Sequence, residues 1–475
     1  MKTDNSWIRS DRAGRPGPLR LKVIVTIAIL IAGGAGAVLL NGLGSNANPY
    51  QSEGILVDFG DYNTVWTDID YNETEDPAEM FSIACAGNEN WTAATDGSGA
   101  PISVTVEDSD GTVRNYTDGS GGTWGLWYVA KGSTEYTESE GYSIDASDYT
   151  VVAWAFTAEG EGPAPAVDAT GTSVYGYGRP SSVVTLSPVC TELVAAMDAV
   201  NLIVGTDSYS NWPQSVTDRV DSKAAKIVGN YTDPSYEAIM GTSPDMVFCD
   251  SSQYSHVQMA SLLRSSYVNA VVIYDSDSIG SVLKNILIVG AAMGYGLRAE
   301  YVEDQISSAL TLMESASAGK TGEDSVLVTL GTSASPYVAG TGTYISDIIE
   351  ASSSSNCTDR GGWPNITSEK ISQMNPSCII IIDTEGYTAD EYGLAMSSIS
   401  GEWKTTDAWK NGNVYILCGD LAEMAQRGGP RFAQLTEIFM RILIPDAFGD
   451  GITIPKAIGD DYESYLTFTS ALGFD

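Results

Sequence analysis

Histidine is almost absent from this sequence, because His256 is the only one among 475 residues. A Ser-His-Asp triad would have to use it, and a metal site built from several histidines is impossible. Cysteine is also scarce, and the six present include no C-x-x-C pair, which excludes a zinc ribbon or a thioredoxin-like site. In an oxidising compartment they could still form up to about three disulfides. They are Cys85, Cys190, Cys249, Cys357, Cys378 and Cys418.

Positive charge is the second scarcity. The chain has 24 lysines and arginines against 61 acidic residues, a net charge of −37, and six of the basic residues fall within positions 1–22. The rest of the chain therefore carries a balance of −41. A surface this acidic repels phosphate backbones, so we expect no nucleic acid partner. Solubility in salt or at a charged cell surface explains the excess most simply.

Complete catalytic loops are missing as well. Gly319-Lys320-Thr321 invites a phosphate-loop interpretation, but Glu314 stands where that loop needs its first glycine. The segment 340–342 lacks the third glycine of a dinucleotide fingerprint, and the segment 331–335 lacks the last glycine of a nucleophile elbow. We therefore expect a protein that is not an enzyme.

A long uncharged apolar run occurs near the start of the chain. It covers Val23–Leu40, extends to Leu43, and follows the basic cluster directly. This pattern predicts a transmembrane signal anchor over 23–43, with 1–22 as a cytoplasmic tail and the bulk of the chain extracytoplasmic at the cell membrane. A cleaved signal peptide is the alternative, since 45–47 carries small residues. Export would also make the chain a glycoprotein at some of its N-x-S/T sequons. These are Asn72, Asn90, Asn115, Asn230, Asn356 and Asn365.

After a polar stalk at 41–53, short β-type runs separated by Asp/Gly and Gly/Ser turns predict a small β-rich domain over 54–158. The segment around Trp124 and Trp127, followed by that around Trp154, resembles the β-grasp-like family that includes the carboxy-terminal domain of transcobalamin. Those tryptophans could equally fill a small core. The resemblance suggests a second ligand-handling module. The Pro/Gly/Ala-rich segment 159–178, which is expected to be a flexible linker, would join this module to the rest of the chain.

The remainder predicts an α/β architecture in two lobes. A β-branched run at Val183–Leu186, a helical segment and a second run at Leu202–Thr206 indicate parallel strands in a first lobe, 179–278. Strands at 325–330, 378–383 and 414–417 repeat the plan in a second lobe, 324–448. Between the lobes, apolar residues recur at helical intervals over 281–317 and predict one long inter-lobe helix.

Three segments, VVTLSP with TE, IVG with DSYS and WP, and KIVGNYTDPSYEAIMGTSPDMVF, are similar to the substrate-binding proteins of ABC importers for vitamin B12, siderophores and haem. The likeness covers Ser181–Phe448 and implies the class III periplasmic-binding-protein fold, with a rigid helix between the lobes. It also implies an ABC permease and its ATPase as partners. The ligand would be a corrinoid or other metal chelate, transported and not held as a prosthetic group. The alternative ligands are a ferric siderophore and haem. The alternative role is a surface scavenger or sensor that works without a permease.

The resemblance also implies cleft residues. Trp212, Tyr231, Tyr337 and Trp363 match positions where B12-binding members place aromatics, and flat rings suit a corrin face. Each could instead pack a surface loop. Arg427 stands where the family often has a cleft arginine, with Asp420 nearby, and could pair with a carboxylate or chelate oxygen.

Three further residues have a possible role. His256 follows a predicted strand end and could serve as an axial ligand to cobalt or haem iron, although a solvated loop histidine is the simpler interpretation. Glu237 and Glu369 match the glutamates, one on each lobe, that meet permease arginines in the family. The competing interpretation is an ordinary first-turn carboxylate favoured by the helix dipole.

Overall fold

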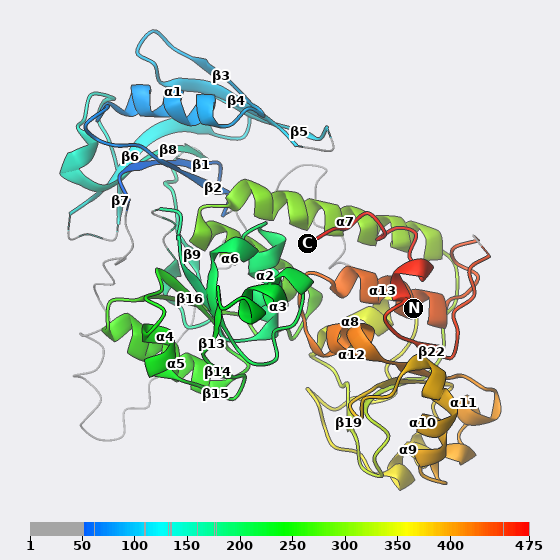
Figure 1. The fold of residues 1–475 in the computed structure, drawn as a ribbon. Helices are drawn as coiled ribbons and strands as arrows, with labels where there is room; N and C mark the ends of the chain where they lie inside the picture. Colours follow the sequence, from blue (N-terminus) through cyan, green and yellow to red (C-terminus); the bar gives the residue numbers. More distant parts are fainter. Residues whose placement is uncertain are drawn as a thin grey trace, which may run out of the picture.

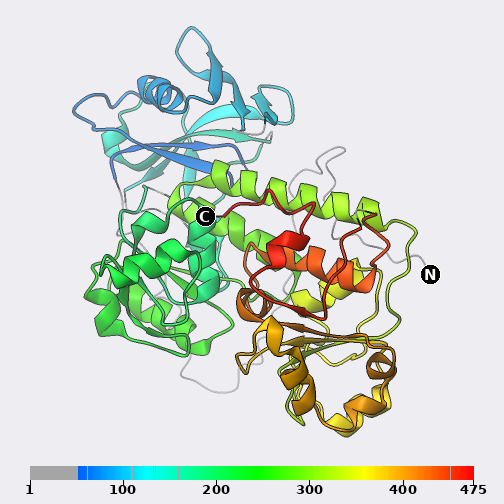
Figure 2. The ribbon, with the colours of Figure 1, turned by 45° about the vertical axis from the view of Figure 1, so that its right-hand side comes forward.

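The computed structural model describes residues 52–474, apart from positions 61, 109–110, 132, 134, 159, 175, 177 and 450. The expected cytoplasmic tail and membrane anchor lie outside these residues. Within the described part, each helix is too short or too polar to cross a bilayer. Figures 1 and 2 show a β-rich domain on one side of a long helix and two α/β lobes on the other.

The β-rich segment has a hydrophobic core of its own. Its main sheet has the order β2-β1-β8-β6-β7, in which β1 runs parallel to β8 and the other neighbours are antiparallel. A second sheet has the order β3-β4-β5. The bounds are β1 Gly54–Asp58, β2 Thr64–Asp68, α1 Pro77–Gly87, β3 Trp91–Thr95, β4 Pro101–Glu107, β5 Val113–Thr117, β6 Thr123–Ala130, β7 Tyr136–Glu138 and β8 Tyr149–Thr157.

Helix α1 closes this core. Asp76 caps it by accepting from the backbone N–H groups of Ala78 and Glu79, and Pro77 occupies its first turn. Trp154 is fully buried and donates its indole N–H to the carbonyl of Pro77 over 2.9 Å. Trp124 is buried in the same core and donates its indole N–H to the carbonyl of Tyr116. These two tryptophans are therefore core residues.

The segment 159–178 is not the flexible linker that its composition predicted. It forms a hairpin of β9 (Ala166–Val167) and β10 (Ser173–Val174), whose residues Ala166 and Val174 enter the core of the first lobe. Asp168 is buried in its turn and accepts from the backbone N–H of Val272 over 3.0 Å and from Arg264. A buried carboxylate with these partners fixes the hairpin to the lobe.

The first lobe contains a parallel sheet of order β13-β12-β11-β16-β17, as expected from the sequence. Its elements are β11 Val183–Thr185, α2 Pro188–Ala196, β12 Ile203–Thr206, α3 Gln214–Asp221, β13 Lys226–Ile227, β14 Gly229–Asn230, β15 Asp233–Pro234, α4 Tyr236–Met240, β16 Met246–Asp250, α5 Tyr254–Ser265 and β17 Asn269–Ile273. The sheet is covered by α2 and α5, and β14 and β15 form a separate small hairpin.

The prediction of one helix over 281–317 is wrong. The segment forms two helices, α6 (Ile279–Met293) and α7 (Gly296–Ser317). Gly294 ends α6 in the left-handed conformation, with φ +71°, which an L side chain rarely adopts. The two helices then pack so closely that a Cβ on Gly290 would lie 2.2 Å from that of Ala299. Of the pair, α7 runs from the side of the first lobe towards the second lobe, with the β-rich domain over its start (Figures 1 and 2).

The second lobe has a sheet of order β19-β18-β20-β21-β22, parallel except for β19. Its elements are β18 Val326–Leu330, β19 Tyr337–Val338, α8 Tyr344–Ala351, α9 Ser368–Met374, β20 Cys378–Ile382, α10 Tyr392–Ser398, α11 Asp407–Lys410, β21 Val414–Leu417, α12 Gly419–Gln426, α13 Phe432–Leu443 and β22 Ala457–Ile458. Short 3-10 helices cover Ala146–Asp148, Val200–Leu202, Ala389–Glu391, Trp403–Thr405 and Tyr462–Tyr465.

The lobe does not end at 448, where the sequence likeness stops. Strand β22 lies in the last part of the chain and pairs with β21. The buried carboxylate of Glu437 accepts from the backbone N–H groups of Thr467, Phe468 and Thr469, and Phe474 reaches the core. The C-terminal extension is therefore part of the second lobe.

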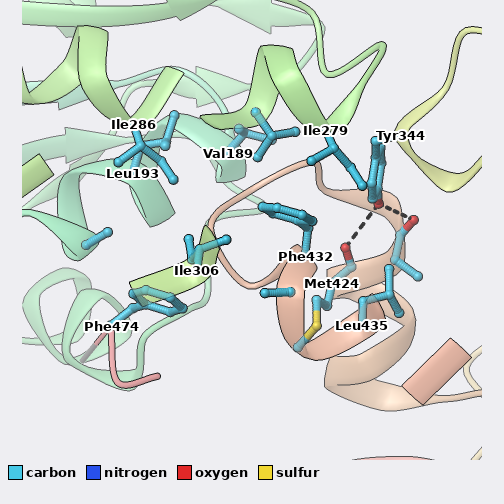
Figure 3. Close-up of a cluster of buried hydrophobic side chains, with 14 of the residues drawn as sticks. Val189, Leu193, Ile279, Ile286, Ile306, Tyr344, Met424, Phe432, Leu435 and Phe474 are labelled. Carbon is cyan, nitrogen blue, oxygen red and sulfur yellow. Dashed lines mark hydrogen bonds between the residues drawn. The ribbon is translucent and has the colours of Figure 1, made fainter. Parts of the chain in front are cut away.

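One apolar core continues through both lobes. Figure 3 shows Leu193 of α2 near Ile286 of α6, and Phe432 of α13 near Tyr344 of α8. Tyr344 is buried and donates its hydroxyl hydrogen to the carbonyl of Ala425 over 2.7 Å. Close-packed interiors resist sliding, so this shared core makes the connection between the lobes stiff.

The β-rich domain is docked on the start of α7. Arg114 of β5 lies 2.7 Å from Asp108 in its own domain and 3.2 Å from Glu300 of α7, and it also pairs with Asp304. Val65 of β2 forms an isolated antiparallel bridge with Tyr295. The domain is thus held by a buried cation between carboxylates and by backbone pairing.

All six cysteines are free thiols, so the expectation of up to three disulfides is wrong. They are distributed over separate cores, and burial raises the pKa of each thiol. Buried thiols of raised pKa are unreactive packing groups.

Candidate functional site

A cleft of about 560 Å³ lies where the carboxyl ends of the two parallel sheets face each other. Open α/β sheets bind ligands at this edge. The first lobe contributes the start of α2, the loop after β12 and the turn of the β14-β15 hairpin, and the second lobe contributes the loop after β20 and helix α12. The lining residues are Pro188, Val189, Tyr209, Tyr231, Thr232, Asp383, Thr384, Gly386, Gly419, Ala422, Glu423, Gln426 and Arg427.

Tyr231 lies in this cleft, as the sequence predicts. It occupies the hairpin turn between β14 and β15, and its hydroxyl is 2.7 Å from that of Ser252. Burial raises its pKa to about 12, so the hydroxyl keeps its proton. The side chain therefore offers a ring and a hydrogen-bonding group to the cleft.

His256 is neither a solvated loop residue nor an open axial ligand. It is fully buried in α5. Its Nδ1 accepts from the backbone N–H of Asp250 over 3.2 Å, and its Nε2 lies 2.7 Å from the carbonyl of Tyr231, to which it donates. Both ring nitrogens are thus engaged, and burial lowers the histidine pKa. The imidazole holds the hairpin turn that carries Tyr231, whose ring it meets edge-on at 5.5 Å.

Tyr209 is a cleft residue that the sequence interpretation missed. It stands in the loop after β12 and is 61% exposed, so its ring is available to a ligand. Its backbone N–H is bound by the carboxylate of Asp207 at 2.8 Å. The signal was present in the sequence, because an aromatic residue shortly after a parallel strand faces the ligand edge.

The other three predicted aromatics do not line this cleft. Trp212 is half-buried and stacks on the guanidinium of Arg431, whose Cζ lies 4.1 Å from the ring centroid. Trp363 is half-buried against the shared core. Tyr337 is 55% exposed on β19. The structure therefore brings Tyr209 and Tyr231 together at the cleft and places these three elsewhere.

Arg427 lines the cleft as predicted, but it is already paired. It lies 3.3 Å from Glu192 of the first lobe and 3.0 Å from Glu423 of its own helix. It also donates to the side-chain oxygen of Asn211 over 2.9 Å. The arginine thus bridges the two lobes at the cleft floor.

A second arginine completes this network. Arg431 is 1% exposed and lies 2.8 Å from Glu192, which is equally buried. It also holds both oxygens of Asp420, at 2.9 and 2.8 Å. Buried guanidinium groups with several carboxylate contacts favour a fixed geometry. Glu192 and Arg431 were not identified from the sequence, because their role depends on contacts between distant segments.

Further carboxylates surround the cleft. Asp383 follows β20 and accepts from the backbone N–H groups of Glu385, Gly386 and Tyr387. Burial raises its pKa, and burial likewise raises the pKa of Asp207 below Tyr209. The cleft therefore combines two tyrosines, hydroxyl and amide groups, and an excess of acidic side chains.

The two predicted docking residues are both exposed. Glu237 lies in the first turn of α4 and Glu369 in the first turn of α9. Figure 1 shows these helices at the end of their lobes that faces away from the β-rich domain. Neither residue lines the cleft.

Comparisons with known proteins agree with this architecture. A family described as Periplasmic binding protein matches residues 183–421. An uncharacterized ABC transporter substrate-binding lipoprotein of Bacillus subtilis is 26% identical over 285 residues, covering 59% of this chain and 85% of the relative. A structure of Helicobacter pylori CeuE with Ni-His has a TM-score of 0.51 and 18% identity, and covers 65% of this chain and 94% of that one.

A periplasmic heme binding protein from Pseudomonas aeruginosa is also similar, with a TM-score of 0.48, 18% identity and coverage of 56% of this chain and 94% of that chain. The family match extends over half of the chain, from β11 in the first lobe to α12 in the second. This chain belongs to the periplasmic binding protein family.

Proposed function

We propose that this protein is the substrate-binding component of an ABC importer and delivers a bulky metal chelate, in the first place a corrinoid, to a permease and its ATPase. The observation that carries this proposal is the cleft of about 560 Å³ lined by both lobes, with Tyr209 and Tyr231 beside hydrogen-bonding groups. Sites of this size and mixed lining take organic ligands. A corrin presents a broad apolar face and an amide-bearing rim, which suit rings and hydroxyl groups.

A chelate fits the lining better than a bare metal ion. The single histidine of the chain has both ring nitrogens engaged in hydrogen bonds. Asp383, the carboxylate at the end of β20, is occupied by backbone N–H groups. A transition metal would need several free nitrogen, sulfur or oxygen donors at fixed geometry.

The alternatives share the cleft. A ferric siderophore or haem could bind there, and a role as a surface scavenger or sensor without a permease is compatible with the same ligand site. The β-rich domain is the observation that favours the scavenger role. It is fixed to α7 but contributes no residue to the lining of the cleft.

The β-rich domain has a parallel central pair β1/β8, a β1-β2 hairpin and one packed helix, which supports a β-grasp-like, transcobalamin-like assignment. We propose that it is a second ligand-handling module. Since Trp124 and Trp154 fill its core, a ligand surface on it would use other residues. We call the part of the chain after the proposed anchor at 23–43 the ectodomain. Calorimetry that compares the full ectodomain with a chain lacking the β-rich domain tests the role of that domain through ligand affinity and capture rate.

The location proposed for the chain is the outer face of the cell membrane, with the apolar run at 23–43 as its anchor. The similar Bacillus subtilis protein is a lipoprotein, so its anchor is of a different kind, but a membrane-attached position next to a permease would be common to both.

Absorbance spectroscopy of the purified ectodomain after incubation with cyanocobalamin, haemin and ferric hydroxamate siderophores tests the function. A bound chelate retained through gel filtration at one equivalent per chain supports it. Failure to retain any of these chelates would contradict it.

A further inference from the structure

The charge of the cleft carries information about its ligand. Arg427 is the one basic side chain among the described residues that line it, whereas Asp383 and Glu423 are acidic. An anionic ligand would normally be held by an arginine or lysine with its charge available. The question is therefore whether Arg427 is available.

The contacts of Arg427 show that its charge is already balanced. Glu192 lies 3.3 Å from one guanidinium nitrogen and Glu423 lies 3.0 Å from the other. Arg431 behind it cannot relieve either partner, because Arg431 is held by Glu192 at 2.8 Å and by Asp420 at 2.8 Å. The network has two guanidinium groups and three carboxylates, and is therefore negative as a whole.

Neighbouring acidic groups reinforce this sign. Asp207 lies under Tyr209 and binds its backbone N–H, and Asp250 lies behind Tyr231 through Ser252, whose hydroxyl donates to it over 2.7 Å. Asp383 lines the opposite wall. A carboxylate brought between these walls would be desolvated next to like charges with no free cation among the described lining residues.

We infer that the cleft selects neutral or cationic metal chelates and rejects chelates that carry a free carboxylate or a net negative charge. This inference rests on the proposed function, because it concerns the charge of the ligand in the same cleft. It separates the candidates by chemistry: amide-rimmed corrinoids and cationic hydroxamate chelates are accepted, whereas haem with its propionates and anionic catecholate chelates are not.

Pairs of related ligands that differ in the charge of one group provide the test. One pair is cyanocobalamin and its monocarboxylic acid, in which one propionamide is hydrolysed. The other is ferrioxamine B, which has a free ammonium group, and its N-succinyl derivative, which has a carboxylate there. Titration calorimetry of the wild-type ectodomain at low salt should give, for each pair that binds, at least roughly tenfold weaker binding of the carboxylate member. The difference should shrink as salt is raised, because exposed charges are screened.

Variants assign the effect to the cleft. Glu423→Gln removes one carboxylate beside Arg427. It should reduce the ratio of the two affinities within a pair by about two- to fivefold, a modest effect because Glu423 is partly exposed. Glu350→Gln, an exposed carboxylate on α8 outside the lining, is the matched control and should leave the difference unchanged.

The outcomes are distinct. Equal binding within a pair, or tighter binding of the carboxylate member, overturns the charge inference and leaves the proposed function standing. If neither pair binds but haemin does, the charge inference is overturned and the proposed function stands; if haemin also fails to bind, both fail. A change in Glu350→Gln equal to that in Glu423→Gln would also overturn the assignment to the cleft.

Discussion

At the scale of single residues, the cleft depends on side chains that are held by others. Tyr231 gains its position from the buried imidazole of His256, and Tyr209 from the carboxylate of Asp207. Such support fixes the rings before a ligand arrives, which reduces the entropy lost on binding. Substitutions at the supporting residues should therefore alter affinity without removing a ligand contact.

Replacing Tyr231 by Ala removes a ring from the cleft wall and should weaken binding of cyanocobalamin by about 1–3 kcal/mol, or roughly 5- to 150-fold. Tyr231→Phe keeps the ring and loses only the hydrogen bond to Ser252, so its loss should be smaller. Tyr337→Ala is a useful comparison, because Tyr337 is exposed outside the lining. Titrations in which Tyr337→Ala weakens binding more than Tyr231→Ala would place the ligand at Tyr337 and contradict the assignment of the site to this cleft.

His256 predicts a pH dependence. Burial lowers its folded-state pKa below the ordinary value, so between these two values the unfolded chain binds more protons than the folded one. Stability contributed by the neutral imidazole is then complete above about pH 6.5 and declines as the pH falls through that value. Protonation would also oppose the Nδ1 contact with the backbone N–H of Asp250.

The measurement is urea unfolding between about pH 7.5 and pH 5, comparing the wild type with the non-titrating variant His256→Gln. The wild type should lose more stability over this interval than the variant. Identical losses would show that His256 has the same pKa in the folded and the unfolded protein, and would contradict the lowered pKa.

At the scale of elements, the sequence was informative wherever local pattern decides structure. β-branched runs located β11, β16, β18, β20 and β21, since buried parallel strands are continuous apolar segments. The sequence pattern was misleading where tertiary contacts determine the local structure. The periodicity over 281–317 continues through Gly294, which ends α6, and the Pro/Gly composition of 159–178 hides a hairpin that Asp168 fixes to the first lobe.

The same limit applies to the site. Tyr231 and Arg427 were predicted as cleft residues from the resemblance to the binding-protein family and its B12-binding members, and the structure places both in the lining. The pairing of Glu192 with Arg427 and Arg431 joins residues more than two hundred positions apart. Spacing in one sequence contains no signal for such a contact.

The docking of the β-rich domain on α7 gives a prediction at this scale. Arg114 is 10% exposed between Asp108, Glu300 and Asp304, so Arg114→Ala leaves three carboxylates together without their cation. The substitution should weaken the docking of the β-rich domain on α7 by on the order of 3 kcal/mol. Small-angle scattering should show a wider distribution of domain positions, while affinity of the cleft for cyanocobalamin stays the same. Lys131→Ala, at an exposed position of the same domain, is the control. A compact scattering profile for Arg114→Ala would contradict the role of this residue.

The exposed first turns of α4 and α9 give another prediction. Glu237→Lys together with Glu369→Lys should abolish uptake of the chelate into cells, because opposite charges at the permease surface would become like charges. Ligand affinity of the purified double variant should match the wild type, since neither residue lines the cleft. Normal uptake, or loss of ligand binding, would remove these residues from the docking surface.

At the scale of the whole molecule, the two lobes behave as one body because they share one core. Helix α6 starts beside α8 of the second lobe, where its first backbone N–H is bound by Asp347 at 2.9 Å, and it ends against the β9-β10 hairpin on the first lobe. The C-terminal segment closes the same core through Phe474. Ligand binding should therefore change the shape of the cleft by small adjustments, in contrast to the large hinge rotation of lobes with separate cores.

Thermal unfolding tests this continuity. Phe432 is fully buried where α13, α8 and α6 meet, so Phe432→Ala leaves a cavity in the shared core and should destabilise it by about 3–5 kcal/mol. Because the core belongs to both lobes, differential scanning calorimetry should show their single transition move to lower temperature as a unit. Ile55→Ala, within the separate core of the β-rich domain, should instead move only the transition of that domain. Two separate unfolding transitions for the lobes in Phe432→Ala would show that the lobes fold independently. The connection between them would then be less stiff than the shared core implies.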